Sequence, residues 1–249
     1  MKYYGITDRG LARKSNQDSY MVSANHAHDL FLMVCDGIGG ARGGDVASRT
    51  AVRHISEAFS QTDAFTDEGD LKRWLKTEIN AVNKTILEMG TKDERLNGMG
   101  TTLAAVILTG CGKFVVNIGD SRVYGYRFEN TEFIQLTTDH TLVEDLIRHG
   151  ELTREQAAEY PRKNVLTNAL GVWDNIRYDV EVHNEPLDGF LICSDGLHGY
   201  VSPEILKSIV FDRDSDPSLR ARRLVKQALL AGGYDNISVI LLDLEGEML

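Results

Sequence analysis

Four strand-like segments follow one another between residues 101 and 137, and this run constrains the fold more than any other feature of the sequence. The segments read TTLAAVILT, KFVVNIG, RVYGYRF and EFIQLT, and no helical pattern separates them. Strands joined by short connections pair antiparallel, whereas parallel strands need long crossovers. We therefore predict an α+β fold in which antiparallel sheets carry helices on their outer faces; a doubly wound parallel sheet is the weaker alternative.

The remaining segments complete this pattern. Apolar residues at helical spacing predict helices over 43–60 and 70–89, with further helices near 202–210 and 216–231. The segment 139–160 has helical and loop-like character, and strand-like runs lie at 2–7, 18–24, 31–36, 176–183, 189–195 and 236–244. Because no polar linker and no internal repeat interrupts the 249 residues, we expect one domain over residues 1–249.

Charge and cysteine content argue against several classes of protein. The chain carries 27 basic and 37 acidic residues, a net charge of -10, and no cluster of Lys or Arg, so we expect no nucleic-acid partner. Three cysteines without a C-x-x-C spacing disfavour a disulfide framework and a zinc site. Since no signal-like apolar stretch opens the chain and no 18 apolar residues run together, we expect no membrane partner and a cytoplasmic protein.

Aspartates recur at the ends of the predicted strands, beside small or turn-forming residues. They are Asp18, Asp36 before Gly37, Asp120 after Gly119, Asp195 before Gly196, and Asp235 before Asn236. Any one of them is ordinary turn chemistry. If all five strand ends meet at one edge of the sheets, however, the carboxylates repel one another unless a cation joins them. Hard divalent cations with oxygen ligands suit such a cluster, and the Gly37 carbonyl can approach a metal beside Asp36 because Gly37 has no side chain.

Five glycines between residues 37 and 44 raise the alternative of a phosphate-binding nucleotide loop. A P-loop needs G-x-x-x-x-G-K-[ST], and no lysine follows these glycines. A dinucleotide fingerprint needs G-x-G-x-x-G, whereas the sixth position counted from Gly37 is Arg42. A nucleotide-dependent dehydrogenase is therefore a distant alternative.

Six motifs in order resemble those of the protein phosphatase 2C family, the metal-dependent serine/threonine phosphatases. They are RKSNQD (13–18), DGIGGARGGDVAS (36–48), GMGTTL (98–103), IGDSR (118–122), SDGL (194–197) and GYDNIS (233–238). The resemblance extends from Gly5 to Asp243 and is closest to bacterial stand-alone catalytic domains. It implies a four-layer α-β-β-α sandwich, in which two packed antiparallel sheets are flanked by helices and carry a binuclear metal site at one end.

The resemblance also implies a set of metal ligands. Asp36 would bridge two Mn²⁺ or Mg²⁺ ions, and Asp195 and Asp235 would complete the protein ligands of the first ion. The Gly37 carbonyl would bind the second ion, and Asp18 would act through a metal-bound water. A water bridging the two ions would then attack phosphoserine or phosphothreonine directly.

Three further residues receive roles from the same resemblance. Asp120, together with Asp195, would hold a weaker third ion. Arg13 would grip the substrate phosphate, which suits a guanidinium better than an ammonium group. Asn236 would support the last aspartate. The partners implied are phosphorylated proteins, among them a bacterial Ser/Thr protein kinase and its targets, and the chain is expected to be a monomer.

Two segments depart from the family pattern. Residues 139–171 resemble the flap beside the site, but the usual His-Pro is Tyr160-Pro161 and the usual arginine before Ala-Leu-Gly is Asn168. These differences affect flap contacts and leave the metal residues untouched.

The second departure concerns the proton donor. Family members often carry a histidine, proposed to protonate the leaving oxygen, where this chain has Ile38 and Ala41. His140 and His198 are candidate substitutes, although a lone histidine is more often structural. The missing acid keeps open a pseudophosphatase that binds phosphoproteins with little turnover.

Overall fold

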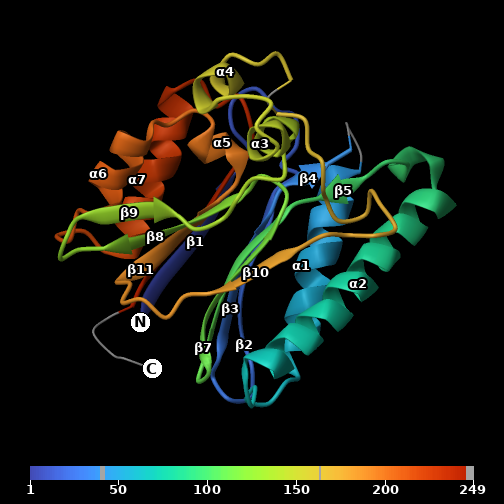
Figure 1. Ribbon diagram of the computed structural model, residues 1–249, viewed down its shortest axis with the longest axis horizontal. Helices are drawn as coiled ribbons and strands as arrows, with labels where there is room; N and C mark the ends of the chain where they lie inside the picture. Colours follow the sequence, from blue (N-terminus) through green and yellow to red (C-terminus); the bar gives the residue numbers. More distant parts are fainter. Residues whose placement is uncertain (40–42, 163, 245–249) are drawn as a thin grey trace.

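Two antiparallel sheets packed face to face form the centre of the molecule (Figure 1). The structure, a computed structural model, describes residues 1–39, 43–162 and 164–244. The first sheet has the order β1 (Lys2–Asp8), β12 (Ile237–Asp243), β11 (Gly189–Cys193), β8 (Arg122–Arg127) and β9 (Glu132–Gln135). The second has the order β10 (Asp179–Val182), β7 (Gly112–Ile118), β6 (Leu103–Thr109), β3 (Leu30–Cys35) and β2 (Ser19–Ala24). A short pair, β4 (Gly37–Ile38) with β5 (Gly100–Thr101), extends from the second sheet toward the site.

Helices cover the outer face of each sheet and complete the four layers. Helices α1 (Gly44–Ser60) and α2 (Glu68–Lys92) share a core with the second sheet, and α6 (Pro203–Val210) and α7 (Pro217–Leu230) share one with the first. The remaining helical elements are short: η2 (Glu94–Leu96), α3 (Leu142–Arg148), α4 (Arg154–Ala158) and α5 (Asp195–His198). The predicted α+β sandwich is confirmed.

Strand β3 shows why a fully apolar run becomes a strand here. Phe31 and Met33 face the core under α1 and α2, whereas Leu32 and Val34 face the first sheet, as the two-residue period of a strand requires. Both faces are buried because the strand lies in an inner layer of the sandwich. Side chains of both sheets, including Phe190 of β11, meet in one core between them.

The helix caps show that the predicted helix boundaries are correct to within a few residues. The Asp67 side chain accepts a hydrogen bond from Asp70 N and begins α2 two residues earlier than predicted. Ser202 and Asp216 cap α6 and α7, each directly before a proline at the first helical position.

The strand predicted over 176–183 is shorter than its pattern indicates, since β10 spans only Asp179–Val182. Ile176 and Tyr178 are partly buried against the core under α1 and α2 without joining a strand. Arg177 N instead donates to the Asn168 side chain. Among the described residues, no helix is both long and apolar enough to cross a membrane.

Candidate functional site

The register of the sheets brings the strand ends that carry aspartates to one end of the sandwich. Cys35 pairs with Ser19, so the chain continues into Asp36 beside the residue that precedes β2. Cys193 pairs with both Arg122 and Val239, so Asp195 lies beyond the same end as the start of β8 and of β12. The aspartates are Asp18 before β2, Asp36 after β3, Asp120 between β7 and β8, Asp195 at the start of α5, and Asp235 before β12.

Electrostatics show that the five carboxylates act on one another. Burial, followed by the charges of Asp18, Asp195, Asp120 and Asp235, raises the pKa of Asp36 well above its usual range. Burial is also the main cause that raises the pKa of Asp18 to about 7 and that of Asp120 to about 8. The pKa of Asp195 is raised by burial and by the charge of Asp235. The pKa of Asp36 is thus affected by the charges of all four other aspartates.

Two buried oxygen atoms in this cluster have no hydrogen-bond partner in the part of the chain that the structure describes. Asp18 Oδ2 accepts a 2.7 Å hydrogen bond from the Ser194 hydroxyl, but Asp18 Oδ1 and Asp195 Oδ1 accept none. Within the described ranges, no three acidic, histidine or cysteine side chains converge tightly enough to form a ready-made cage for an ion. The ligand chemistry nevertheless fits hard divalent cations: carboxylate oxygens predominate, and two of these oxygens are buried with no donor among the described residues.

Gly37 is required by close backbone packing. A Cβ at this position would lie 2.1 Å from Gly44 O at the start of α1 and 2.6 Å from Gln17 O. The Asp36 carbonyl accepts hydrogen bonds of 2.9 Å from Thr102 N and from Thr101 Oγ1. The Asp36 loop is thus held between α1 and β5, which is a reason for glycine in addition to the metal approach predicted from the sequence.

The N-terminal loop is attached to the Asp235 segment. Arg13 Nη2 donates a 2.6 Å hydrogen bond to Asp235 Oδ2, and about half of its side chain is exposed. Asn236 is buried; its Oδ1 accepts from Gln17 N at 2.8 Å, and its Nδ2 donates to the carbonyl oxygens of Arg9 and Ser15. Asn236 therefore holds Arg13 and Asp235 on the same side of the cluster.

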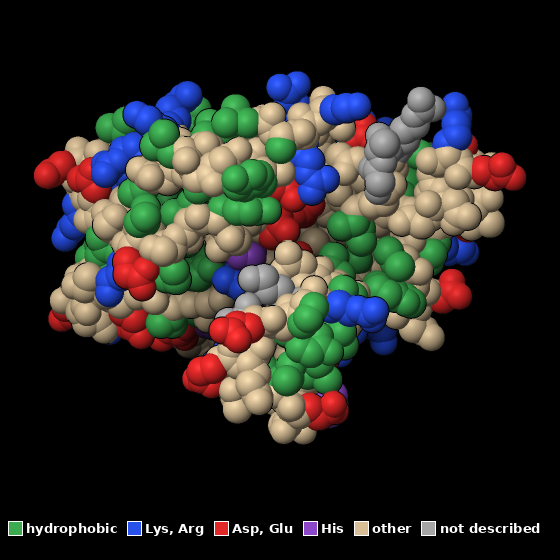
Figure 2. Space-filling view, turned by 90° about the horizontal axis from the view of Figure 1, so that it is seen from above, with side chains coloured by type: hydrophobic (Ala, Val, Ile, Leu, Met, Phe, Trp, Pro, Cys, Tyr) green, Lys and Arg blue, Asp and Glu red, His purple; other side chains and the backbone are tan. Residues whose placement is uncertain are grey.

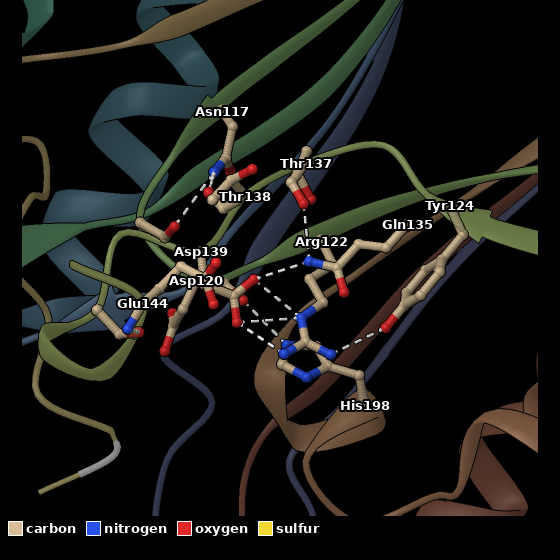
Figure 3. Close-up of polar contacts among 12 residues, drawn as sticks. Asn117, Asp120, Arg122, Tyr124, Gln135, Thr137, Thr138, Asp139, Glu144 and His198 are labelled. Atoms are coloured by element: carbon tan, nitrogen blue, oxygen red, sulfur yellow. Dashed lines mark hydrogen bonds and ion pairs between the residues drawn. The ribbon is translucent and has the colours of Figure 1, made fainter. Parts of the chain in front are cut away.

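A second network, which the sequence did not reveal, surrounds Asp120 (Figure 3). Arg122 donates to both carboxylate oxygens of Asp139 at 2.7–3.1 Å and to the Tyr124 hydroxyl at 3.1 Å. His198 Nε2 donates to the Asp120 carbonyl at 2.9 Å. Because Asp139 and Tyr124 occupy the guanidinium, Arg122 leaves the Asp120 carboxylate without a hydrogen-bonded cation. Arg122 lies in the IGDSR motif, but only the tertiary structure identifies Asp139 as its partner.

Both candidate histidines form hydrogen bonds within the protein. His140 Nδ1 accepts from Gly119 N at 3.2 Å and from Asn168 Nδ2 at 2.8 Å, so its Nε2 carries the proton and donates to Asp179 at 2.9 Å. Burial lowers the pKa of His198 to about 4, and the His198 side chain lines a cavity together with Asp120 and Asp195. His140 is therefore structural, whereas the role of His198 as an acid stays a prediction. Ile38 offers no proton donor, and Ala41 lies outside the described residues.

A cavity of about 430 Å³ opens beside the aspartates. One wall comes from the 139–171 segment, including Glu144, Ile147 and Arg154, and the opposite wall contains Asp120 and Asp195. In the space-filling view, the middle of the corresponding face is hollowed and acidic side chains gather there (Figure 2). The flap-like segment thus borders the carboxylates directly.

Comparisons with known proteins agree with this geometry. A family model described as Protein phosphatase 2C matches residues 12–229. Serine/threonine phosphatase stp of Listeria welshimeri is 41% identical over 238 residues, which cover 95% of this chain and 93% of that protein. Protein phosphatase PhpP of Streptococcus pneumoniae is 36% identical over 243 residues, with 97% of each chain covered. The structure of the S. agalactiae serine/threonine phosphatase has a TM-score of 0.89 at 32% identity and covers 96% of this chain and 98% of its own.

Proposed function

This chain belongs to the protein phosphatase 2C family and is a serine/threonine protein phosphatase, and we propose that its strand-end aspartates hold the divalent cations on which that family depends. The observation that carries the proposal is the meeting of five aspartates at one end of the sandwich. Two buried oxygens of this cluster, Asp18 Oδ1 and Asp195 Oδ1, lack a partner among the described residues.

We take the ligand roles from the motif positions of the family. Asp36, which experiences the other four charges, would hold both ions, and Asp195 and Asp235 would complete the protein ligands of the first. The Gly37 carbonyl would serve the second ion, and Asp18 would contribute through water. Mn²⁺ and Mg²⁺ both suit carboxylate and carbonyl ligands.

Asp120 is proposed as a ligand of a weaker third ion shared with Asp195. Its side chain is partly buried, lines the cavity, and is close enough to Asp195 for that charge to contribute to its raised pKa. The hydrogen bond from His198 to the Asp120 carbonyl holds its backbone in place.

Hydrolysis then depends on both the ions and the protein groups. Divalent cations held by these residues would supply Lewis acidity, which activates water as the nucleophile and offsets the charge on the phosphoryl oxygens. Arg13 is half-exposed and within reach of the cluster, so its guanidinium can leave Asp235 and bind two phosphate oxygens at once. Asn236 keeps the Arg13 loop against the site.

Substrates and assembly form a further part of the proposal. The phosphatase acts on phosphoproteins, and we propose a bacterial Ser/Thr protein kinase and its targets among them. We also propose that residues 1–249 form one monomeric catalytic domain with a flap at 139–171, since both sheets share a core. The cytoplasmic location predicted from the sequence stays a prediction.

Metal removal tests this mechanism. The protein is dialysed against EDTA and assayed on nitrophenyl phosphate and on a phosphothreonine peptide, and Mn²⁺ or Mg²⁺ is then restored. We expect activity only with added metal, and no covalent phosphoenzyme trapped by acid quenching. Full activity in excess EDTA, or a trapped phosphoprotein, would refute the proposed mechanism.

A further inference from the structure

Three large apolar side chains lie exposed beside the cluster and form what we call the aromatic shelf: Leu11, Tyr200 and Tyr234. Their exposed fractions are 69%, 43% and 58%, respectively. The rings of Tyr200 and Tyr234 are 5.5 Å apart between centroids. Exposed apolar side chains that are scattered singly need no explanation, whereas a contiguous group beside an active site marks a binding surface.

Two consecutive glycines position the shelf. Gly232 and Gly233 have φ values of +124° and +54°, which side-chain-bearing residues rarely adopt. A Cβ on Gly232 would lie 2.2 Å from the Tyr234 ring, and one on Gly233 would lie 2.9 Å from Leu11 Cγ. Leu11 N also donates to Gly233 O at 2.7 Å. Tyr234 and Leu11 therefore pack against two adjacent glycines, and both side chains remain exposed.

The shelf is continuous with the residues proposed to bind phosphate and metal. Tyr234 directly precedes Asp235, and Leu11 is two residues before Arg13 in the loop that Asn236 holds. Tyr200 lines the same cavity as Asp120 and Asp195. The charges of Asp195 and Asp235, after burial, raise the pKa of Tyr200, which places its hydroxyl near the cluster.

We propose that the aromatic shelf binds an apolar side chain of the phosphoprotein substrate, close in sequence to the phosphorylated residue. The inference rests on the proposed function, because it takes Arg13 and the aspartates as the phosphate site. A substrate chain that places its phosphate at Arg13 passes over Leu11 or Tyr234 within a few residues. Tyrosine rings that remain exposed are well suited to this contact, since they provide large apolar area with little loss of conformational entropy.

A second copy of this chain is the competing occupant of the shelf. Such a dimer would cover Arg13 and obstruct the substrate, whereas a substrate side chain uses the shelf and the phosphate site together. The continuity of the two surfaces therefore favours the substrate.

The test uses phosphothreonine peptides that differ only in carrying Leu or Ser at each of the three positions on either side of the phosphothreonine. With Mn²⁺ present, kcat/KM is measured for every peptide, and nitrophenyl phosphate reports on the catalytic centre. We expect Leu to exceed Ser about tenfold at one or two positions, which corresponds to ~1.4 kcal/mol. In Tyr234→Ala and in Leu11→Ser this ratio should fall toward one, and Tyr234→Phe should keep it.

Tyr3→Ala is the matched control, because Tyr3 is 47% exposed and lies on β1 opposite Leu242, at the far end of the sandwich. It should leave the peptide ratio unchanged. The proposal that the shelf binds substrate would be overturned by equal rates on the Leu and Ser peptides in the wild type. It would also be overturned by a Leu-to-Ser ratio of kcat/KM that is unchanged in both Tyr234→Ala and Leu11→Ser. A wild-type dimer in sedimentation that Leu11→Ser dissociates would overturn it as well. Absence of any metal-dependent hydrolysis by the wild-type protein would instead refute the proposed function.

Discussion

The two ends of strand β12 deal with buried charge in opposite ways. At one end, Asp243 forms an ion pair with Arg220, which is only 1% exposed, and also contacts the Tyr126 hydroxyl. Arg220 donates a further hydrogen bond to the Val210 carbonyl at 2.7 Å. At the other end, Asp235 leads into a group of buried and partly buried carboxylates whose only hydrogen-bonded arginine within the described ranges is the half-exposed Arg13.

The difference shows what each end contributes. A buried ion pair with hydrogen-bonded partners holds α7 against β12, and removing one partner leaves an unpaired charge in a medium of low dielectric. Buried carboxylates that repel one another destabilise the fold but create strong affinity for an external cation. Arg122 could have neutralised the cluster, yet Asp139 holds it. The site end is therefore arranged for ligand binding, and the opposite end for stability.

The largest expected effect comes from Asp36→Asn. The substitution removes the carboxylate charge that interacts with the four other aspartates. We therefore expect kcat to fall at least ~10³-fold, the upper range for losing one group that stabilises transition-state charge. Without metal, the variant should be at least as stable as the wild type, because a repulsive buried charge is gone. Assays at saturating Mn²⁺ and urea unfolding in EDTA check both statements. Strong destabilisation of the metal-free variant would break the contrast between the two ends.

Asp243→Asn tests the opposite end. The buried Arg220 would lose its counter-charge, so the free energy of unfolding should fall by about 3 kcal/mol, while kcat of the folded protein stays unchanged. Urea unfolding and the nitrophenyl phosphate assay at low temperature measure the two quantities. Lys72→Met, which breaks the exposed pair with Glu68, is the control and should cost less than ~1 kcal/mol. An equally small effect of Asp243→Asn would show that the buried ion pair contributes no more to the free energy of unfolding than an exposed one.

Added metal should stabilise the folded protein through the aspartate cluster alone. At a Mn²⁺ concentration 100 times the dissociation constant, the free energy of unfolding should rise by ~2.7 kcal/mol. Asp243→Asn should show the same increment, and Asp36→Asn should show little or none. Calorimetric titration gives the dissociation constant independently of catalysis. An equal increment in Asp36→Asn would mean that Mn²⁺ binds elsewhere.

The smallest expected effect is that of Arg13→Lys. Lysine keeps the charge but loses the two-point contact with phosphate, so KM should rise several-fold, or ~1 kcal/mol, with kcat nearly unchanged. Steady-state kinetics on the phosphothreonine peptide measures both constants. Unchanged KM and kcat would assign Arg13 to the surface alone, and Asp235 would then have no partner involved in substrate binding.

Local sequence was sufficient to predict antiparallel sheets with helices outside them and the five strand-end aspartates, whereas the four-layer arrangement was implied by the family resemblance. The helices α1, α2, α6 and α7 and the strands on either side of residue 36 follow from hydrophobic periodicity. The aspartates could be found from the sequence because each one adjoins the end of a strand. In an antiparallel sheet, every second connection between strands lies at the same end of the sheet. Residues 176–183 show the limit: half of that apolar pattern packs on the core as a loop because Asn168 holds Arg177.

Tertiary structure alone decided how the polar groups around the cluster are used. His140 and His198 were both candidate acids, and only the tertiary structure shows their hydrogen-bond partners, Asp179 and the Asp120 carbonyl. Asn168, which departs from the family pattern, proved to be the partner of His140. The aromatic shelf likewise joins residues more than 180 positions apart in the chain. Periodicity and turn chemistry are properties of neighbouring residues and can be read from the sequence, whereas the partner of a buried polar atom depends on which distant segment the fold places within 3 Å of it.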